Sequence, residues 1–195
     1  MSNFGFVKSL TFGIGSFSPE NESHIPGVYD LRDELDSPIN QGERGICVSA
    51  CVTDMIRYRS KILGRKYTRN EDFFWKHRSD KNVDGMSPRN AFDIAQAYSL
   101  VQSYATIKSA IAAKAAILAN GPVLIALPVY ARESRFFWVG SEIQGYHAVT
   151  LVGYYDNKQE FILRNSWGTE WADGGYSTLP YSDFTKALEA WTIFS

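Results

Sequence analysis

The chain has 195 residues, which is long enough to bury a sizeable core without a metal or disulfide staple. With 45% hydrophobic and 21% charged residues, its composition is that of a globular protein and argues against a disordered or fibrous chain. The 20 basic and 21 acidic residues give a formal net charge of -1, so nothing in the charge points to an electrostatic nucleic-acid or membrane binder.

Residues 1 to about 24 are rich in Gly, Ser, Asn and Phe and lack a clear period, which predicts an N-terminal arm. From residue 49 to about residue 59, apolar residues recur at helical spacing and predict the first helix. We expect it to begin between residues 45 and 47, with polar Thr53 and Asp54 on the face opposite the apolar stripe.

Two further helices follow in the first half of the chain. Ser87 and Pro88 form a typical helix start, an N-cap followed by proline at the first helical position. An alanine-rich stretch predicts a third helix from about residue 106 to residue 120, where Gly121 and Pro122 provide a stop. The first half therefore reads as mainly helical.

The second half of the chain has a strand-like pattern. Short runs rich in β-branched and aromatic residues predict strands at residues 123–129, 148–155, 160–164 and 176–178. A helical half followed by a strand-rich half indicates an α+β protein with two packed lobes. We expect a helical lobe over about residues 25–121 and a β-rich, barrel-like lobe over about residues 122–195.

The three histidines are His24, His77 and His147, and only the last lies in an informative context. It precedes an apolar strand, and Asn165 follows 18 residues later at the end of the next predicted strand. An amide placed on an imidazole fixes its tautomer and orientation, as the third member of nucleophile–base–orienter sites does. Trp167, two residues further on, is placed to shield that contact from water.

Cys47 lies where a glycine-containing loop enters the first predicted helix. The unpaired N–H groups and the positive dipole end of a helix start stabilise a thiolate, and the same N–H groups can donate to an oxyanion. Gln41, six residues earlier, can supply a second oxyanion donor from its side-chain amide. Cys51 falls on the apolar face of the helix, where we expect it to pack in the core rather than pair with Cys47.

Taken together, these motifs resemble the papain-like cysteine peptidases (clan CA, papain family) in order and local context. The matching segments are Asn40-Gln41-Gly42, Cys47, Gly145-Tyr146-His147-Ala148-Val149 and Arg164-Asn165-Ser166-Trp167-Gly168. The resemblance runs from about residue 25 to the C-terminus. Cys47 and His147 lie 100 residues apart, against roughly 130–150 in papain relatives, which indicates a compact variant.

The resemblance implies roles for these residues. Cys47 would be the nucleophile, His147 the general base and then acid, Asn165 the orienter, and Gln41 the oxyanion donor beside the Cys47 backbone N–H. For substrate binding, it implies a segment at Asp84-Gly85 whose backbone pairs with an extended peptide, followed by Met86 at the edge of a pocket, together with Gly145 and Trp167.

Some positions depart from the family pattern. Arg44 stands where the family usually has a cysteine three residues before the nucleophile, so the usual disulfide is absent there. Ile46, next to the nucleophile, is bulkier than usual and is expected to narrow the cleft entrance. The residues before about position 25 are too few for the family's inhibitory propeptide, so we expect no full propeptide in the N-terminal arm.

The sequence therefore predicts a cysteine endopeptidase that hydrolyses peptide bonds through a thiolate nucleophile and an acyl-enzyme. Two alternatives stay open. The same scaffold can carry a different acyl-transfer activity, such as an amidase, transpeptidase or deamidase. A binding module without activity is the other, and the intact set of site residues argues against it.

We expect a monomer that acts on protein or peptide substrates and binds no nucleic acid or membrane. No cofactor or metal is expected, because two cysteines four residues apart and scattered histidines do not form a tetrahedral ligand set. No basic region precedes the mildly apolar N-terminal stretch, so we expect no signal peptide and favour the cytoplasm. Export by a non-classical route, or association with a virus, stays open.

Overall fold

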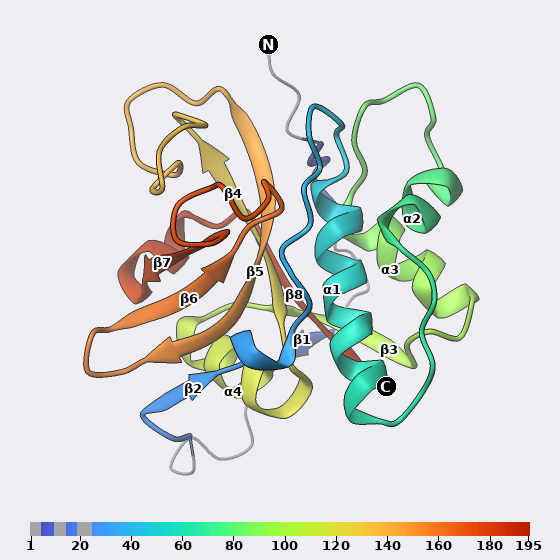
Figure 1. The fold of residues 1–195 in the computed structure, drawn as a ribbon, viewed down its shortest axis with the longest axis horizontal. Helices are drawn as coiled ribbons and strands as arrows, with labels where there is room; N and C mark the ends of the chain where they lie inside the picture. Colours follow the sequence, from blue (N-terminus) through green and yellow to red (C-terminus); the bar gives the residue numbers. More distant parts are fainter. Residues whose placement is uncertain (1–4, 10–14, 19–24) are drawn as a thin grey trace.

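The computed structural model describes residues 5–9, 15–18 and 25–195. The expected arm is thus described only in two short pieces, and His24 lies outside the described residues. Three helices pack together on one side of a mixed sheet, on the right in Figure 1. They are α1 (Cys47–Ile62), α2 (Glu71–His77) and α3 (Pro88–Ala97).

The sheet runs in the order β1-β3-β8-β4-β5-β6-β7, and β2 also pairs with β5. Its strands are β1 (Ser16–Phe17), β2 (Val28–Asp30), β3 (Ser103–Ile107), β4 (Val123–Val129), β5 (Gly145–Tyr155), β6 (Glu160–Arg164), β7 (Tyr176–Pro180) and β8 (Glu189–Phe194). Neighbouring strands are antiparallel, except for the parallel pair β1 and β3. The α+β class is confirmed, and within the described residues the sheet is open rather than a closed barrel.

Two of the predicted helices begin where the sequence places them. α1 starts at Cys47, and α3 starts at Pro88 with Ser87 as its cap, whose Oγ accepts a hydrogen bond from the Asn90 N–H at 3.2 Å. The expected polar face of α1 is wrong, since Thr53 and Asp54 are buried. A helix that is covered nearly all round belongs to an interior, and α1 lies between the other helices and the sheet.

The third predicted helix starts later than expected. α4 (Ala110–Asn120) begins after Ser109, whose side chain caps it, while residues 103–107 form strand β3. β3 pairs with β8 at the far end of the chain, a partner that local helical periodicity does not reveal. Two short 3-10 helices, η2 (Arg32–Glu34) and η3 (Tyr181–Lys186), complete the elements of the described residues.

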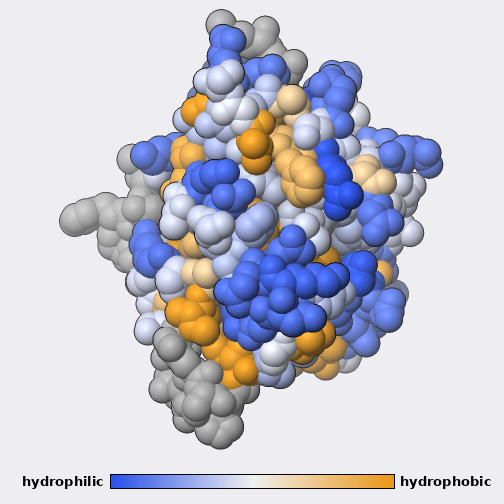
Figure 2. All heavy atoms as spheres, turned by 90° about the vertical axis from the view of Figure 1, so that its left-hand side faces the viewer, coloured by the Kyte–Doolittle hydropathy of each residue, from blue (hydrophilic) through white to orange (hydrophobic). Residues whose placement is uncertain are grey.

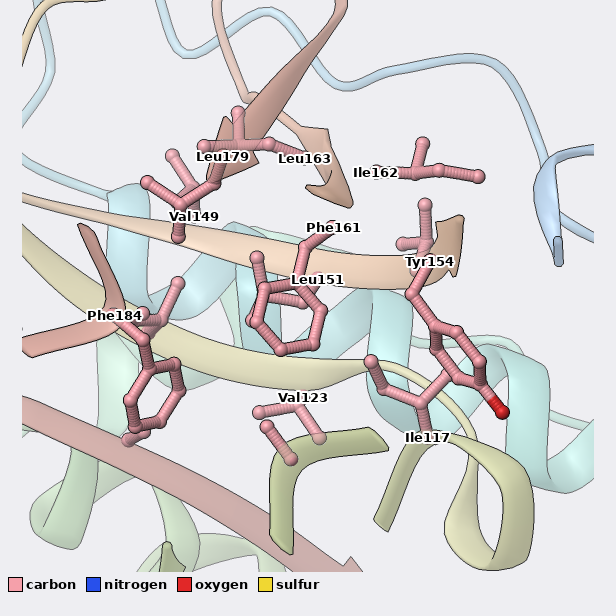
Figure 3. Packing of buried hydrophobic residues seen from close by; sticks show 14 of the residues in the cluster. Ile117, Val123, Val149, Leu151, Tyr154, Phe161, Ile162, Leu163, Leu179 and Phe184 are labelled. Atoms are coloured by element: carbon pink, nitrogen blue, oxygen red, sulfur yellow. The ribbon is translucent and has the colours of Figure 1, made fainter. Parts of the chain in front are cut away.

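Two hydrophobic cores hold the molecule together. The sheet core is formed by β4 to β7, η3 and α4, and Figure 3 shows Ile117 and Val123 facing Leu151 and Phe161 inside it. The other, the junction core, is formed by α1, α3 and the sheet residues that face them. α4, although it precedes residue 121, buries its alanines in the sheet core.

The outward face of the sheet side is mostly hydrophilic, with small separate hydrophobic groups (Figure 2). In the described part of the chain, no helix has the length and apolar character needed to cross a membrane. The same residues contain no group of three or more His, Cys, Asp or Glu side chains arranged to hold a metal ion.

Candidate active site

Cys47 is the first residue of α1 and is fully buried. Its Sγ accepts a hydrogen bond from the backbone N–H of Ala148 at 3.5 Å, and Ala148 directly follows His147 on β5. The fold therefore places the sulfur at the helix start against the strand that presents the histidine. Cys51, one turn along α1, packs in the junction core as predicted, and neither cysteine is in a disulfide.

His147 is held by an amide, as the sequence spacing suggests. Its Nε2 lies 2.7 Å from Oδ1 of Asn165, which immediately follows β6. The Ser166 N–H donates to the same oxygen at 2.8 Å, so Oδ1 is an acceptor and Nε2 carries the hydrogen. In a neutral imidazole the basic nitrogen is then Nδ1.

Aromatic rings enclose this histidine. Trp167 stacks on His147 with ring centroids 4.6 Å apart and planes at 20°, the position expected of a cover for the His147–Asn165 bond. Phe137 meets the imidazole edge-on at 5.5 Å, a contact that sequence reasoning missed. The guanidinium of Arg132 lies 5.6 Å from the centroid of the Trp167 ring, so a positive charge lies next to this tryptophan.

The Gln41 amide is fixed at both ends. The Ser166 hydroxyl donates to Gln41 Oε1 at 2.6 Å, and Gln41 Nε2 donates to the Arg44 carbonyl at 2.9 Å. Because an amide nitrogen carries two hydrogens, the bond to Arg44 occupies one of them. The Ser166 bond identifies the oxygen end, so the NH₂ group is the end turned toward the loop that leads to Cys47.

A buried ion pair joins α1 to β6, the strand that ends directly before Asn165. Arg164 Nε donates to Asp54 Oδ2 at 2.7 Å, with side-chain exposures of 0% and 8%. The same guanidinium donates to the carbonyls of Asp36 and Ser37, so most of its hydrogens are used. Sequence reasoning missed this pair, and the available signal was an arginine directly before the orienting asparagine.

The pKa of Cys47 differs from the expectation that a helix start stabilises the thiolate. Burial raises the pKa of its thiol to about 12, while the backbone N–H groups of Ala148, Val48 and Cys47 itself pull it down. The donors expected at a helix start are thus present, but the removal of water outweighs them. Ile46, expected at the cleft entrance, is instead fully buried as the residue that caps α1.

The predicted substrate-binding residues lie on several elements. Gly85 and Met86 lie on the loop before α3, and buried Met86 belongs to the same core as Cys47. Gly145 is the first residue of β5 and pairs with Val129 of β4. The structure thus places Met86 at the start of α1 and Gly145 two residues before the histidine.

Comparisons with known proteins agree with this geometry. Residues 47–186, well over half of the chain, match the model of the papain family cysteine proteases. A 52-residue segment is 42% identical to an uncharacterized peptidase C1-like protein of Acanthamoeba polyphaga mimivirus, covering 25% of this chain and 17% of that protein. A 35-residue segment is 54% identical to cysteine proteinase 3 of Entamoeba histolytica, covering 17% and 11%. The matches thus span less than a fifth of the length of these two relatives.

Solved structures share the fold over the whole chain. Xylellain, a cysteine protease from Xylella fastidiosa, superposes with a TM-score of 0.85 at 18% identity, covering 100% of this chain and 96% of xylellain. Digestive procathepsin L 3 of Tenebrio molitor gives 0.75 at 20% identity, covering 100% and 77%. At these identities the likeness establishes the papain-like fold.

Proposed function

The chain belongs to the papain family of cysteine proteases, and we propose that it is a cysteine endopeptidase acting on protein or peptide substrates. One observation carries the proposal: the Cys47 sulfur lies 3.5 Å from the N–H of Ala148, beside a histidine whose far nitrogen is bonded to Asn165 at 2.7 Å. This is the order nucleophile, base, orienter that thiol acyl transfer requires.

The chemistry starts with a proton transfer. His147 takes the proton of the Cys47 thiol, and the sulfur attacks the substrate carbonyl carbon. The negative charge that develops on the carbonyl oxygen is stabilised by the Cys47 backbone N–H and by the Gln41 side-chain NH₂. The imidazolium then protonates the leaving amine, the C–N bond breaks and a thioester remains. Water, deprotonated by His147, hydrolyses the thioester and restores the thiol.

The contacts around Gln41 support its role as oxyanion donor. A free amide side chain samples several orientations, and a donor that must turn during the reaction stabilises charge poorly. Here Ser166 holds the oxygen end and the Arg44 carbonyl holds one hydrogen, so the second hydrogen has a fixed direction. Ser166 is therefore a positioning residue that acts through Gln41.

Peptide hydrolysis tests the proposal, with the two cysteines of α1 as a matched pair. Fluorogenic peptides are screened with the wild-type protein, Cys47→Ala and Cys51→Ala, and folding is checked by circular dichroism. We expect Cys47→Ala to lose at least about 10⁴-fold in kcat/KM, because no other group can form the thioester. Cys51→Ala, which loses only a packing contact, keeps its activity.

Two results would overturn the proposal. Hydrolysis by Cys47→Ala at the wild-type rate would show that Cys47 is not the nucleophile. Consumption of a simple amide, with no peptide cleaved by the wild-type protein, would assign the site to an amidase of the same fold instead.

A further inference from the structure

Arg132 connects the sheet side of the site to the loop before α1. It lies on the connection between β4 and β5, which Figure 1 shows at the same end of the molecule as the start of α1. Its Nη2 donates to the Gly42 carbonyl at 2.9 Å, and its Nη1 donates to Glu43 Oε2 at 3.3 Å. Gly42 and Glu43 belong to the loop between Gln41 and Cys47. The arginine side chain therefore reaches across to the loop that carries Gln41.

The guanidinium of Arg132 has donors to spare. An arginine has five N–H donors, and among the described residues the bonds to Gly42 and Glu43 use two of them. The Arg132 side chain is 31% exposed, so a ligand can reach it from solvent. The Glu43 side chain is 92% exposed, and an ion pair this exposed contributes little free energy. A second carboxylate can therefore join or replace Glu43 on this guanidinium at low cost.

The position of Arg132 relative to His147 decides which part of a substrate it meets. Trp167 stacks on the imidazole at 4.6 Å, and the Arg132 guanidinium lies 5.6 Å from the centroid of the same indole ring. In the proposed reaction His147 protonates the leaving amine, so the residues that follow the scissile bond lie on the histidine side of the site. An extended chain advances about 3.3 Å per residue, so the first or second residue after the bond can reach the guanidinium.

We propose that Arg132 selects substrates with an aspartate or glutamate one or two residues after the scissile bond. The inference rests on the proposed function, because it requires a leaving amine beside His147. Arginine binds a carboxylate through charge-assisted and often paired N–H···O bonds, whereas an amide in the same place accepts a weaker, neutral bond. The pair with Glu43 supports the proposal, because a carboxylate already fits this position.

A purely structural role for Arg132 leads to a different expectation. If the arginine only tied the two loops together, its loss would slow the hydrolysis of all peptides by the same factor. A binding role changes the ratio of kcat/KM between an acidic peptide and the matching amide peptide. That ratio should also fall with rising ionic strength, because salt screens exposed charges.

Paired peptides supply the test. A peptide that the wild-type protein cleaves is made with Asp or with Asn at the first or second position after the scissile bond. Each has an amidated C-terminus, so that only the side chain differs in charge. We expect the wild type to prefer the Asp form about tenfold in kcat/KM, and Arg132→Gln to bring the ratio close to one. Arg132→Lys, which keeps the charge but loses the planar fork of donors, should retain part of the preference.

Two further variants serve as controls for the charge of this region. Arg135→Gln removes an arginine of the same connection whose guanidinium lies 4.9 Å from the Phe136 ring, and it should keep the wild-type ratio. Glu43→Gln removes the carboxylate that competes for Arg132, so it should raise the ratio above that of the wild type.

Binding without catalysis separates this inference from the proposed function. Binding of the Asp and Asn peptides to Cys47→Ala is measured by fluorescence anisotropy, with and without Arg132→Gln. Equal kcat/KM and equal binding for the two forms, or a preference that survives Arg132→Gln, would overturn the inference and leave the peptidase standing. Tighter binding of the Asp form that depends on Arg132, with no peptide hydrolysed by the wild-type protein, would overturn the proposed function and leave a carboxylate site near His147.

Discussion

The sheet core and the helix–sheet junction are both buried, but they are built from different chemistry. In the sheet core, large apolar side chains such as Leu151 and Phe161 fill the space between the strands and α4 (Figure 3). The junction holds the Cys47 thiol and, close to it along α1, the ion pair of Asp54 with Arg164. Buried polar groups cost free energy unless each is paired, so a region rich in them needs a reason beyond stability.

The difference indicates that the two regions have different roles in placing the site residues. The apolar core makes β5 and β6 a rigid support, from whose ends His147 and Asn165 project. The polar junction sets the position of α1, and hence of Cys47, relative to those strand ends. If this is correct, substitutions in the two regions can cost the same stability and differ in their effect on catalysis.

The largest expected effect comes from breaking the junction ion pair. Asp54→Asn keeps the shape but leaves the Arg164 charge buried without its carboxylate, which should lower the free energy of unfolding by about 3–5 kcal/mol. Phe161→Ala should cost a similar amount, about 3–5 kcal/mol, by leaving a cavity in the sheet core. Urea unfolding measures both.

Catalysis then distinguishes these two variants. Under conditions where both are folded, Asp54→Asn should lower kcat several-fold, because Arg164 directly precedes Asn165, whereas Phe161→Ala should leave kcat unchanged. Equal kcat values in the two variants would show that the junction pair has no part in placing the site.

The pH dependence of thiol alkylation comes next in size. Burial raises the pKa of Cys47 to about 12, so the reactive thiolate fraction should grow about tenfold per pH unit between pH 7 and pH 9. Iodoacetamide labelling of Cys47, mapped by mass spectrometry, should follow that rise. A labelling rate that does not change between pH 7 and pH 9 would instead show that Cys47 is a stable thiolate.

A smaller effect is expected from the serine that holds Gln41. Ser166→Ala removes the hydroxyl bonded to the Gln41 oxygen, and a less well fixed oxyanion donor should reduce kcat about tenfold with little change in KM. Ser177→Ala is the control, since this buried serine donates to the Arg135 carbonyl rather than to Gln41. A loss of kcat in Ser177→Ala equal to that in Ser166→Ala would assign the effect to stability.

The smallest effect is expected at the surface. Partial burial raises the pKa of the Asp30 carboxyl, but hydrogen bonds from Arg32 and Tyr155 outweigh it and hold the pKa below its ordinary value. Asp30→Asn should therefore cost less than about 1 kcal/mol of unfolding free energy at pH 7. A lowered pKa contributes its full stabilisation above the unfolded pKa and loses it as the pH falls through the folded-state pKa, so the difference should shrink as the pH falls below about 4 and vanish at still lower pH. A cost as large as that of Asp54→Asn would contradict the contrast between buried and exposed pairs.

Much of the fold could be predicted because its signals are local. The Ser87 cap, the stop at Gly121 and the apolar runs of β4 and β6 depend on neighbours in sequence, and the structure confirms these elements. β3 could not be predicted, because its strand character depends on pairing with β8 about 90 residues later. The burial of Asp54, expected on the polar face of the helix, could not be predicted for the same reason, since its partner Arg164 lies 110 residues away.

In the candidate site, too, local sequence signals could be predicted and contacts between distant segments could not. The segments around Cys47, His147 and Asn165 carry their chemistry in short motifs, so the sequence alone indicated the three residues and the amide–imidazole contact. The contacts of Phe6 with Met86 and Tyr146 depend on the folded backbone, and no sequence motif near Phe6 predicts them. The elevated pKa of Cys47 likewise reflects burial, which the sequence of a helix start does not contain.

The central claim is that the Cys47 sulfur becomes covalently bonded to the substrate acyl group. Rapid mixing with an activated peptide ester, acid quenching and mass spectrometry of the intact and digested protein test it directly. We expect one acyl group per chain, mapped to Cys47 and missing in Cys47→Ala. An acyl group on any other residue, or product release with no covalent species, would contradict the account.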